Sequence, residues 1–472
     1  MDVINTPEFQ RLRGIGQLTP VDLVFPGATH NRFAHSIGAA HVIGMILSQK
    51  RVGKYFEGDR RRLIQPLRLA ALLHDVGHLP FSHVGEMAWL LAAQPDAFAY
   101  HEAGKGPMTV FDSAARARAK PPLHEELSQL LITESRLGEL IDRELDPVDG
   151  EPASALVRRI IAGTHPDLVA RNLLSSDLDC DRLDYLLRDS LMAGLVYGHI
   201  DLSYLIGALL IATGNEGPTL AIDGRHGILT GEHFLLARYY HYAQFVTHKT
   251  VAAAEVTLVA AILELIRCER LPRTLELTGI EFAPAKRIEC LMTLTDAHVE
   301  AKIAEAARGS GSQTLVCASR RLLERKLPKI AAANEGLERA RRGGAPPAHN
   351  WDRLSKPEAK QQLADEIGVG SRDFFYRTTS LPLSGVPGDI SPADAVKDPE
   401  GLRKSVRKAA KVSVDDAPPE LLIDHSFVLK GLANHDWTTR RVFVLEPPGS
   451  YEPRCPSANF NALKKYFAED KG

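Results

Sequence analysis

The residues whose types and spacing could carry out chemistry begin with a stretch at positions 69–86. An apolar run there ends in His74-Asp75, and His78 and His83 follow closely. The spacing predicts that the run and His78 share one helix, which breaks before His83. Neighbouring residues of a helix point about 100° apart, so His74 and Asp75 can both reach one ion beside the helix end. Imidazole nitrogen with carboxylate oxygen suits a borderline divalent metal such as Mn, Fe, Zn or Co.

The apolar run argues against the alternative interpretation, which is a surface helix that happens to carry histidines. Because the run buries the helix, the polar residues after it lie deep in the structure, where a buried charge needs a partner or a metal. His35, at the start of a mostly apolar helix, is the upstream candidate for a further ligand. Its alternative role is that of a capped core histidine.

Residues 177–191 form the second dense group of such residues, and we expect them to be helical. On that helix Asp177, Asp181 and Tyr185 share a face, which Asp189 continues. Like charges on one face repel each other by several tenths of a kcal/mol per pair, so the face persists more readily if a cation or hydroxyl groups lie opposite it. The alternative is a solvated acidic face.

Cationic side chains near these residues indicate an anionic substrate. Four of them stand beside metal-type or aromatic residues, namely Arg32, Arg182, Arg238 and Lys249. The planar fork of arginine suits phosphate oxygens, so together with a metal these cations suggest a polyphosphate. Three histidines would then be left for proton transfer or phosphate contacts, which an ordinary pKa near ~6.5 suits: His78, His83 and His124.

The whole chain has the composition of a soluble globular protein. Of its 472 residues, 44% are hydrophobic and 25% are charged, with Lys+Arg 57 against Asp+Glu 59. This balance provides no global basic field for a nucleic acid or an anionic membrane, so we expect neither as a partner. The five cysteines form no CxxC pair and no signal peptide is visible, which indicates a cytoplasmic protein.

The order of periodic segments predicts a mainly α fold with a small β-hairpin. A helix should begin at Pro7 after Thr6 as N-cap. Residues 218–229 should form the hairpin, and residues 234–266 one long helix or two. Residues 92–121 have few apolar residues at any period and indicate an irregular insertion.

The character of the chain changes toward its C-terminal end. Residues 300–341 should be helical, and a linker-like stretch follows at about 341–348. Residues 421–423 and 442–445 are typical of strands, and no catalytic constellation is visible around them. The predicted parts are a catalytic domain, residues 1–309, and a smaller α+β region, residues 310–472.

The ordered motifs resemble those of the HD-domain phosphohydrolases, in the branch of the bacterial deoxynucleoside triphosphate (dNTP) triphosphohydrolases and the mammalian SAM-and-HD-domain enzyme. The resemblance covers roughly residues 1–265 and rests on five segments: 6–13, 25–36, 74–83, 179–189 and His248-Lys249. It implies a helical, metal-dependent phosphohydrolase core, here without a SAM domain.

The resemblance also implies roles for individual residues. The family's metal ligands match His35, His74, Asp75 and Asp181. Its histidines near the α-phosphate match His83 and His124, with His78 close to them. Its phosphate-binding positions match Arg32, Arg182, Arg238 and Lys249. Its sugar-binding positions match Gln17, Tyr185 and Asp189, and Leu18 matches a residue that crowds the 2′ position.

We therefore expect metal-dependent hydrolysis of a dNTP to deoxynucleoside and triphosphate, with Mn, Fe, Zn, Mg, Co or Ni as the ion. Two alternatives stay open: an HD phosphodiesterase or nucleotidase for another nucleotide, and a nucleotide-binding regulator without turnover. The resemblance further implies a homo-oligomer between dimer and hexamer, with a tetramer favoured, and a nucleotide effector. Arg13 of the family's effector site is retained, whereas Asn5 replaces its guanine-reading aspartate.

Overall fold

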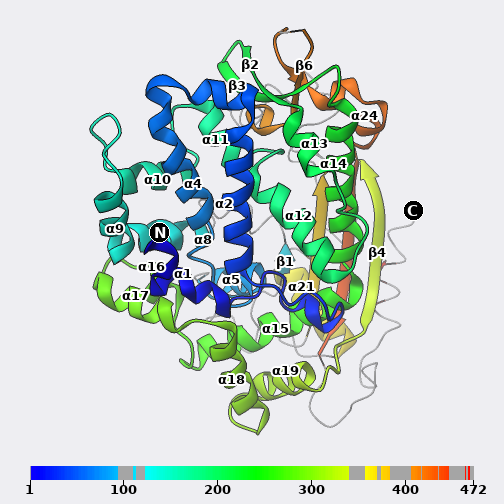
Figure 1. Ribbon diagram of the computed structural model, residues 1–472. Coiled ribbons are helices and arrows are strands. Elements are labelled where there is room, and N and C mark those ends of the chain that lie inside the picture. Colours follow the sequence, from blue (N-terminus) through cyan, green and yellow to red (C-terminus); the bar gives the residue numbers. More distant parts are fainter. Residues whose placement is uncertain are drawn as a thin grey trace.

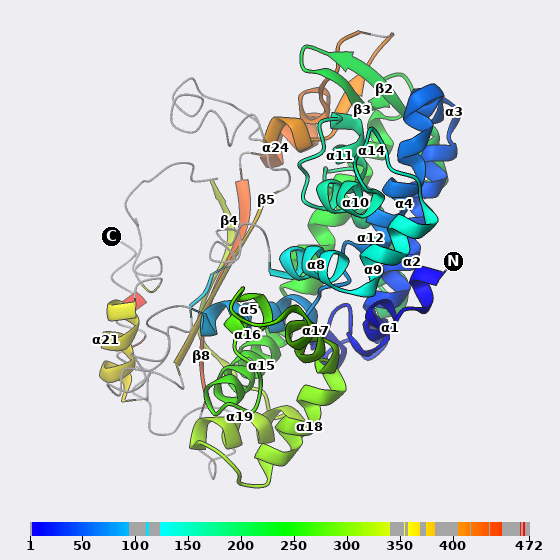
Figure 2. The same cartoon turned by 90° about the vertical axis from the view of Figure 1, so that its left-hand side faces the viewer.

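The computed structural model describes residues 2–93, 110–112, 123–339, 354, 357–368, 374–382, 405–415, 417–433, 435–445, 463 and 466–467. Within these residues the fold is mainly helical, as predicted, with one small sheet along a side of the helical body and another at its end (Figures 1 and 2). The predicted linker at 341–348 and most of the predicted insertion at 92–121 lie outside the described residues.

The helices follow one another in the order of their labels. Up to residue 207 they are α1 (Pro7–Gln10), α2 (Arg32–Ser48), α3 (Lys50–Gly53), α4 (Ile64–Leu73), α5 (Ser82–Ala92), α8 (Leu123–Glu134), α9 (Arg136–Glu144), α10 (Ala153–Ile161), α11 (Leu168–Leu174), α12 (Cys180–Ala193) and α13 (Leu202–Gly207). Then come α14 (Ile228–Tyr240), the π-helix η6 (His241–Val246), α15 (Lys249–Arg267), α16 (Thr274–Thr278), α17 (Pro284–Thr293), α18 (Asp296–Ala307), α19 (Gln313–Leu323), α21 (Pro357–Ile367) and α24 (Phe427–Ala433). Short 3₁₀ turns are η1 (Asp2–Asn5), η2 (Arg11–Gly14), η3 (Val21–Leu23), η4 (Lys54–Phe56), η5 (Gly58–Leu63) and η7 (Leu422–His425).

Local signals start the helices that matter for the site, and burial holds them together. The Thr6 side chain caps α1, as predicted, and the Asn31 side chain accepts from Ala34 N–H to cap α2. Helix α15 is buried at every position from Val251 to Ile266 and packs against α5 and α19. Helix α2 packs against both α4 and α12, which brings three site-bearing helices together.

Two four-stranded sheets contain strands from both parts of the chain. The first has the order β2 (Leu209–Gly214), β3 (Gly217–Asp223), β6 (Lys411–Ser413) and β7 (Glu420–Leu421). The second has the order β1 (Val110–Asp112), β5 (Phe374–Pro382), β8 (His435–Val444) and β4 (Ile330–Arg339). In the first sheet β3 pairs in parallel with β6, with Ile222 opposite Val412, so the C-terminal region docks on the helical part.

The predicted hairpin at 218–229 is wrong in its second strand. β3 does cover 217–223, but its antiparallel partner is β2, which precedes it, and α14 begins at Ile228. The reason is the turn at Asp223, whose side chain accepts from Arg225 N–H (2.9 Å) and whose carbonyl accepts from Gly227 N–H (2.8 Å). This aspartate-centred turn leads the chain into a helix rather than back along the sheet.

Three further predicted elements differ in their bounds. Residues 330–339 were expected to be helical but form β4, because pairing with β8 outweighs the local preference for helix. The strand predicted at 421–423 ends at Leu421 and continues as η7, whereas the strand predicted at 442–445 is confirmed through Val444. The span 234–266 is two helices separated by η6.

The helix predicted at 177–191 begins later than expected. Asp179 is its N-cap residue and accepts from Arg182 N–H (2.7 Å), so α12 starts at Cys180. Asp177 therefore precedes the helix and does not share a face with Asp181.

None of the helices in the described part of the chain has the length and apolar character that a membrane span requires. The division of the chain at residue 309 stays a prediction.

Candidate functional site

The turn after α4 carries the His-Asp pair, and α8 holds this turn in place. Ser128 donates a hydrogen bond to the His74 carbonyl oxygen (2.8 Å) and accepts one from Gly77 N–H (2.9 Å). A Cβ atom on Gly77 would lie 2.2 Å from the Ser128 nitrogen, so the close approach of α8 requires glycine. The helix ends at Leu73. The prediction that His78 continues it is wrong, because the His74 carbonyl bonds to Ser128 instead of a helical amide.

Arg11 fixes the turn from the other side. Its Nη2 donates to the carbonyl oxygens of Val76 (2.9 Å) and His78 (2.7 Å), and its Nη1 donates to that of Leu294 (2.8 Å). Burial lowers the pKa of Arg11 to about 10, which leaves the guanidinium charged at neutral pH. The turn is thus held by bonds to its backbone, which leaves the side chains of His74, Asp75 and His78 to serve the site.

The structure brings together the four residues predicted as metal ligands, which we call the His35 cluster: His35, His74, Asp75 and Asp181. The His35 Nε2 atom lies 3.0 Å from Asp181 Oδ1 and 3.5 Å from Asp75 Oδ2. The His74 Nε2 atom lies 3.4 Å from Asp75 Oδ1 and 3.7 Å from Asp181 Oδ1. Residues from α2, the end of α4 and α12 therefore converge on one point.

The second nitrogen of each histidine in this cluster already has an acceptor. His35 Nδ1 lies 2.8 Å from Asp184 Oδ2, and His74 Nδ1 lies 2.9 Å from the Ala71 carbonyl oxygen. With the proton on Nδ1, the lone pair of each ring is on Nε2. Both Nε2 atoms are buried and have no hydrogen-bond partner. Two buried Nε2 atoms without a hydrogen-bond partner, beside two carboxylates, fit a divalent cation, so the donor set accommodates the metal that the resemblance implies.

The charges of the cluster depend on one another. Burial alone would raise the pKa of Asp75, but Arg32 and the neighbouring histidines hold it well below its ordinary value. Burial likewise opposes charge on His35, but Asp181 and Asp184 raise its pKa to about 10. Metal binding at Nε2 would have to compete with the proton that these carboxylates favour.

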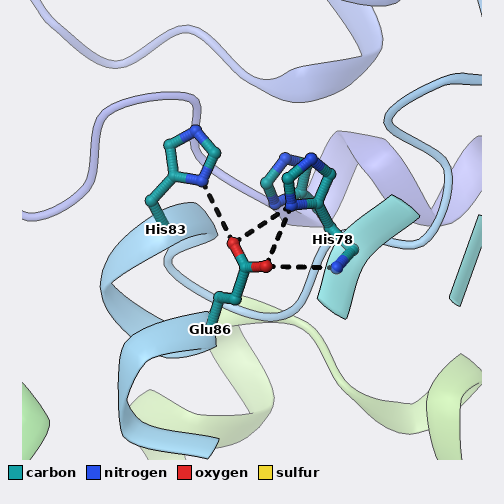
Figure 3. Close-up of side chains that lie close together, drawn as sticks. His78, His83 and Glu86 are labelled. Carbon is teal, nitrogen blue, oxygen red and sulfur yellow. Dashed lines mark hydrogen bonds and ion pairs between the residues drawn. The ribbon is translucent and has the colours of Figure 1, made fainter. Parts of the chain in front are cut away.

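A second group lies beside the first and was only partly foreseen; we call it the Glu86 cluster: His78, His83, Glu86 and His124. The Glu86 carboxylate is fully buried and lies between the histidine rings, as Figure 3 shows. Its oxygens are 3.2 Å from His83 Nδ1 and 3.0 Å from His124 Nδ1. It also accepts from His124 N–H (3.2 Å). Burial opposes its charge, yet His124 and His83 keep the pKa of Glu86 well below its ordinary value.

His78 links the two clusters. Its ring stacks on that of His124, with the centroids 4.2 Å apart and the planes 7° from parallel. Its Nε2 lies 3.3 Å from Asp75 Oδ1 in the His35 cluster. Burial lowers the pKa of His78 well below its ordinary value, and the charges of Arg32 and His124 add to this. His78 is therefore a neutral spacer between the two clusters.

A cavity of about 550 Å³ opens onto both clusters. The predicted residues that line it are Gln17, Leu18, Arg32, His74, Asp75, His83, His124, Asp181, Arg182, Tyr185 and Asp189. His35 and His78 are fully buried behind this wall. Arg238 and Lys249 are not among the lining residues that the structure describes. Arg238 instead pairs with Asp177 (3.2 Å), and Lys249 is exposed at the start of α15.

The predicted phosphate and sugar residues have partners of their own. Arg32 Nη1 lies 2.5 Å from Asp75 Oδ2, and Arg182 bonds to Asp179. Asp189 lies 2.8 Å from His30 Nε2. Its other oxygen is 3.5 Å from the Nε2 atom of His241, a residue of η6.

Sequence reasoning missed several residues of the site. Glu86 lies three residues after His83 on α5, and this helical spacing is the signal that could have found it. Asp184 was seen only as one acid among many. The sequence showed no catalytic constellation after the linker-like stretch at 341–348, yet Arg377 and Lys408 line the cavity. Arg377 pairs with Glu255 (2.6 Å), and Lys408 Nζ donates to Ser175 Oγ (2.6 Å).

Comparison with curated proteins finds relatives that match part of this chain. YwfO, an uncharacterized protein of Bacillus subtilis, is 30% identical over 258 residues, which are 54% of this chain and 50% of that protein. The human deoxynucleoside triphosphate triphosphohydrolase SAMHD1 is 30% identical over 197 residues, which are 41% of this chain and 30% of that protein. The chain thus spans half or less of the length of these relatives.

Solved structures share the fold over nearly the whole chain. A phosphohydrolase of Bacteroides thetaiotaomicron aligns with a TM-score of 0.62 at 23% identity and covers 94% of this chain and 95% of its own. A hypothetical protein of Aquifex aeolicus aligns with a TM-score of 0.63 at 22% identity and covers 94% of this chain and 91% of its own. Residues 32–189, which contain both clusters, match the family model of the HD domain, so this part of the chain is an HD domain.

Proposed function

We propose that this protein is a metal-dependent hydrolase of deoxynucleoside triphosphates that releases deoxynucleoside and triphosphate. The observation that carries the proposal is the pair of clusters that face one cavity. The first presents unpartnered histidine nitrogens and carboxylates, and the second presents histidines hydrogen-bonded to a buried carboxylate. The choice of substrate rests on the similarity to proteins named deoxynucleoside triphosphate triphosphohydrolases.

The four residues of the His35 cluster would hold the divalent metal: His35, His74, Asp75 and Asp181. A metal ion held there would supply Lewis acidity to a phosphate oxygen and would lower the pKa of a water molecule toward ~7. Asp184 orients the His35 ring, which fixes the nitrogen that faces the ion. Arg32 forms an ion pair with Asp75 and offsets its negative charge.

The Glu86 cluster would supply the proton that the leaving 5′-oxygen takes up. Glu86 orients His83 and His124 through their Nδ1 atoms. Both rings line the cavity, so either one can donate a proton to the 5′-oxygen as it leaves phosphorus. Because His78 is held neutral, we assign it a packing role between the clusters.

The remaining lining residues would bind the two ends of the nucleotide. Arg182 and Arg32 face the cavity as planar cations for phosphate oxygens. Gln17, Tyr185 and Asp189 offer polar groups to a sugar, and Leu18 lies beside them. Arg238 and Lys249 would act from outside the lining, so we expect them to contribute less than Arg182.

The test is an assay with Mn²⁺ against each of the four dNTPs, singly and mixed, with chromatography of the products. Triphosphate and deoxynucleoside released by the unmutated protein but not by Asp75→Ala are the expected result. A higher rate with the mixture than with any single dNTP would reveal the predicted nucleotide effector. The predicted homo-oligomer needs a separate measurement of mass in solution.

A second candidate is a phosphodiesterase or nucleotidase of the same family. The observation that favours it is that the ligand atoms of the Glu86 cluster all lie within 4.8 Å of one another, as a second metal would require. Nucleoside mono- or diphosphate as the product would support this candidate. Nucleotide binding without turnover under any divalent metal would instead support the regulator.

A further inference from the structure

Asp296, the first residue of α18, joins two segments that line the cavity. Its Oδ2 accepts a hydrogen bond from Gly16 N–H (2.9 Å), and its Oδ1 accepts one from Phe81 N–H (2.7 Å). The Ser82 hydroxyl donates to the Gly16 carbonyl oxygen (2.6 Å). The two segments are therefore connected twice, once directly and once through the Asp296 carboxylate.

The backbone at this junction adopts conformations that need such support. Phe81 and Ser82 have φ values of 61° and 53°, in the left-handed region that residues with a side chain rarely occupy. Such conformations persist where the surrounding structure fixes them, and they concentrate at functional sites. A Cβ atom on Gly16 would lie 2.0 Å from Thr19 Oγ1 and 3.1 Å from Asp296 Oδ2, so the loop closes tightly around the carboxylate.

Each joined segment leads directly into residues of the cavity. Gly16 precedes Gln17, which lines the cavity on the proposed sugar side. Phe81 and Ser82 precede His83 of the Glu86 cluster. A shift of either segment would change the distance between the bound substrate and the histidine that handles the proton, and small misplacements of reacting groups are costly in rate.

We propose that Asp296 is a positioning residue that holds the Gln17 segment and the His83 segment at a fixed spacing across the cavity. The proposal deepens the proposed function and rests on it for the identity of the substrate. The bonds that Asp296 makes are independent of that identity. Asp296 lies outside the HD-domain match at 32–189, and it acts through the backbone rather than on the substrate.

The charge of Asp296 adds a pH dependence to this role. Burial raises the pKa of Asp296 to about 6, and Glu300 on the same helix adds to this, whereas the bonds from Phe81 and Gly16 oppose it. Arg11 is the cation that feels the Asp296 charge, and Asp22 acts on Glu300. As the pH falls through about 6, the carboxyl gains a proton and one of its oxygens becomes a donor. The two hydrogen bonds by which Asp296 joins the segments are then weaker at low pH than at high pH.

The first experiment measures amide hydrogen exchange, which needs no substrate, in peptides that contain Gly16 and Phe81. At pH 8 we expect Asp296→Asn to accelerate exchange at one or both amides by at least about tenfold, because the amide group of asparagine keeps one acceptor where the carboxylate has two. Glu300→Gln is the matched control, since it removes an exposed acid one turn along α18 without touching either amide. Unchanged exchange at both amides in Asp296→Asn would overturn the proposal.

The second experiment measures kcat/KM from pH 5 to pH 8. A protonated aspartate resembles asparagine. The kcat/KM of the unmutated protein should therefore exceed that of Asp296→Asn about tenfold at pH 8, and the two values should become equal toward pH 5. Glu300→Gln should keep the full rate at pH 8. A ratio that stays constant with pH, or exchange inside α15 that rises as much as at Phe81, would overturn the proposal in favour of a general loss of stability. If the unmutated protein turns over no dNTP, the proposed function fails while the exchange experiment still decides the role of Asp296.

Discussion

The His35 cluster and the Glu86 cluster both combine histidines with carboxylates, but the acceptors of their Nδ1 atoms lie in different places. In the His35 cluster each Nδ1 faces an acceptor in the surrounding protein, and both Nε2 atoms lie near the carboxylates of Asp75 and Asp181. In the Glu86 cluster the Nδ1 atoms of two rings turn inward to one carboxylate. The first arrangement suits a cation that replaces protons, and the second suits a proton that is held and released.

The difference shows that histidine content alone does not assign a role. What separates the clusters is the acceptor behind each ring, because the partner of one imidazole nitrogen fixes the tautomer and so the chemistry of the other. The clusters meet at His78, which lies 3.3 Å from Asp75 and stacks on His124. Because the acceptors differ on the two sides of His78, substitutions confined to one cluster should have distinguishable effects.

The largest effect should come from the His35 cluster. Asp75→Ala should abolish metal binding and reduce the rate at least about 1000-fold, because a metal contributes several kcal/mol to transition-state stabilisation. Elemental analysis and the product assay measure the two consequences. Asp59→Ala removes an exposed aspartate and should change neither. Full activity of Asp75→Ala would contradict a metal-dependent mechanism at this cluster.

The next effect should come from the Glu86 cluster and leave the metal in place. Glu86→Gln should lower kcat about 100-fold, because the histidines lose the carboxylate that orients them. Glu126→Gln on α8 is the control. Loss of the metal in Glu86→Gln would remove the distinction between the two clusters.

A smaller effect should follow from the residue behind His35. Asp184→Asn should weaken metal affinity about 10- to 100-fold while all four ligands remain, because the asparagine orients the ring less firmly and makes it less basic. A metal titration followed by calorimetry measures this change. Arg188→Gln removes the other partner of Asp184 and should weaken the affinity less. Equal affinity in Asp184→Asn and the unmutated protein would show that the His35 orientation is set elsewhere.

The smallest effect should come from the C-terminal region. Lys408→Gln should weaken binding of inorganic triphosphate up to about fivefold, as expected for one exposed charge at the cavity. Arg407→Gln is a close control, since the neighbouring Arg407 pairs with Glu216 on the β2–β3 turn. Added salt should reduce the difference between the two variants. Equal binding by both variants would show that Lys408 takes no part in the phosphate site.

The sequence foresaw those parts of the site whose signals are local. The apolar run before His74, the cap residue Thr6 and the apolar length of α15 follow from short-range patterns, and the structure bears them out. The convergence of the four predicted ligands came from resemblance, because no spacing within the chain places His35 beside Asp181. The predicted start of α12 is wrong, because Asp179, which was expected within the helix, is its N-cap residue.

By itself, then, the sequence determined which residues carry chemical groups and which helices bury an apolar face. Only the tertiary structure decided what stands behind each group, because those partners are far apart in the chain. Glu86 and His124 are 38 residues apart, His35 and Asp184 are 149 apart, and Phe81 and Asp296 are 215 apart. Single hydrogen bonds over such separations leave no periodic trace in a sequence. They form because packing of the apolar helices has already brought the backbones together, and they fix where the protons and the metal can be.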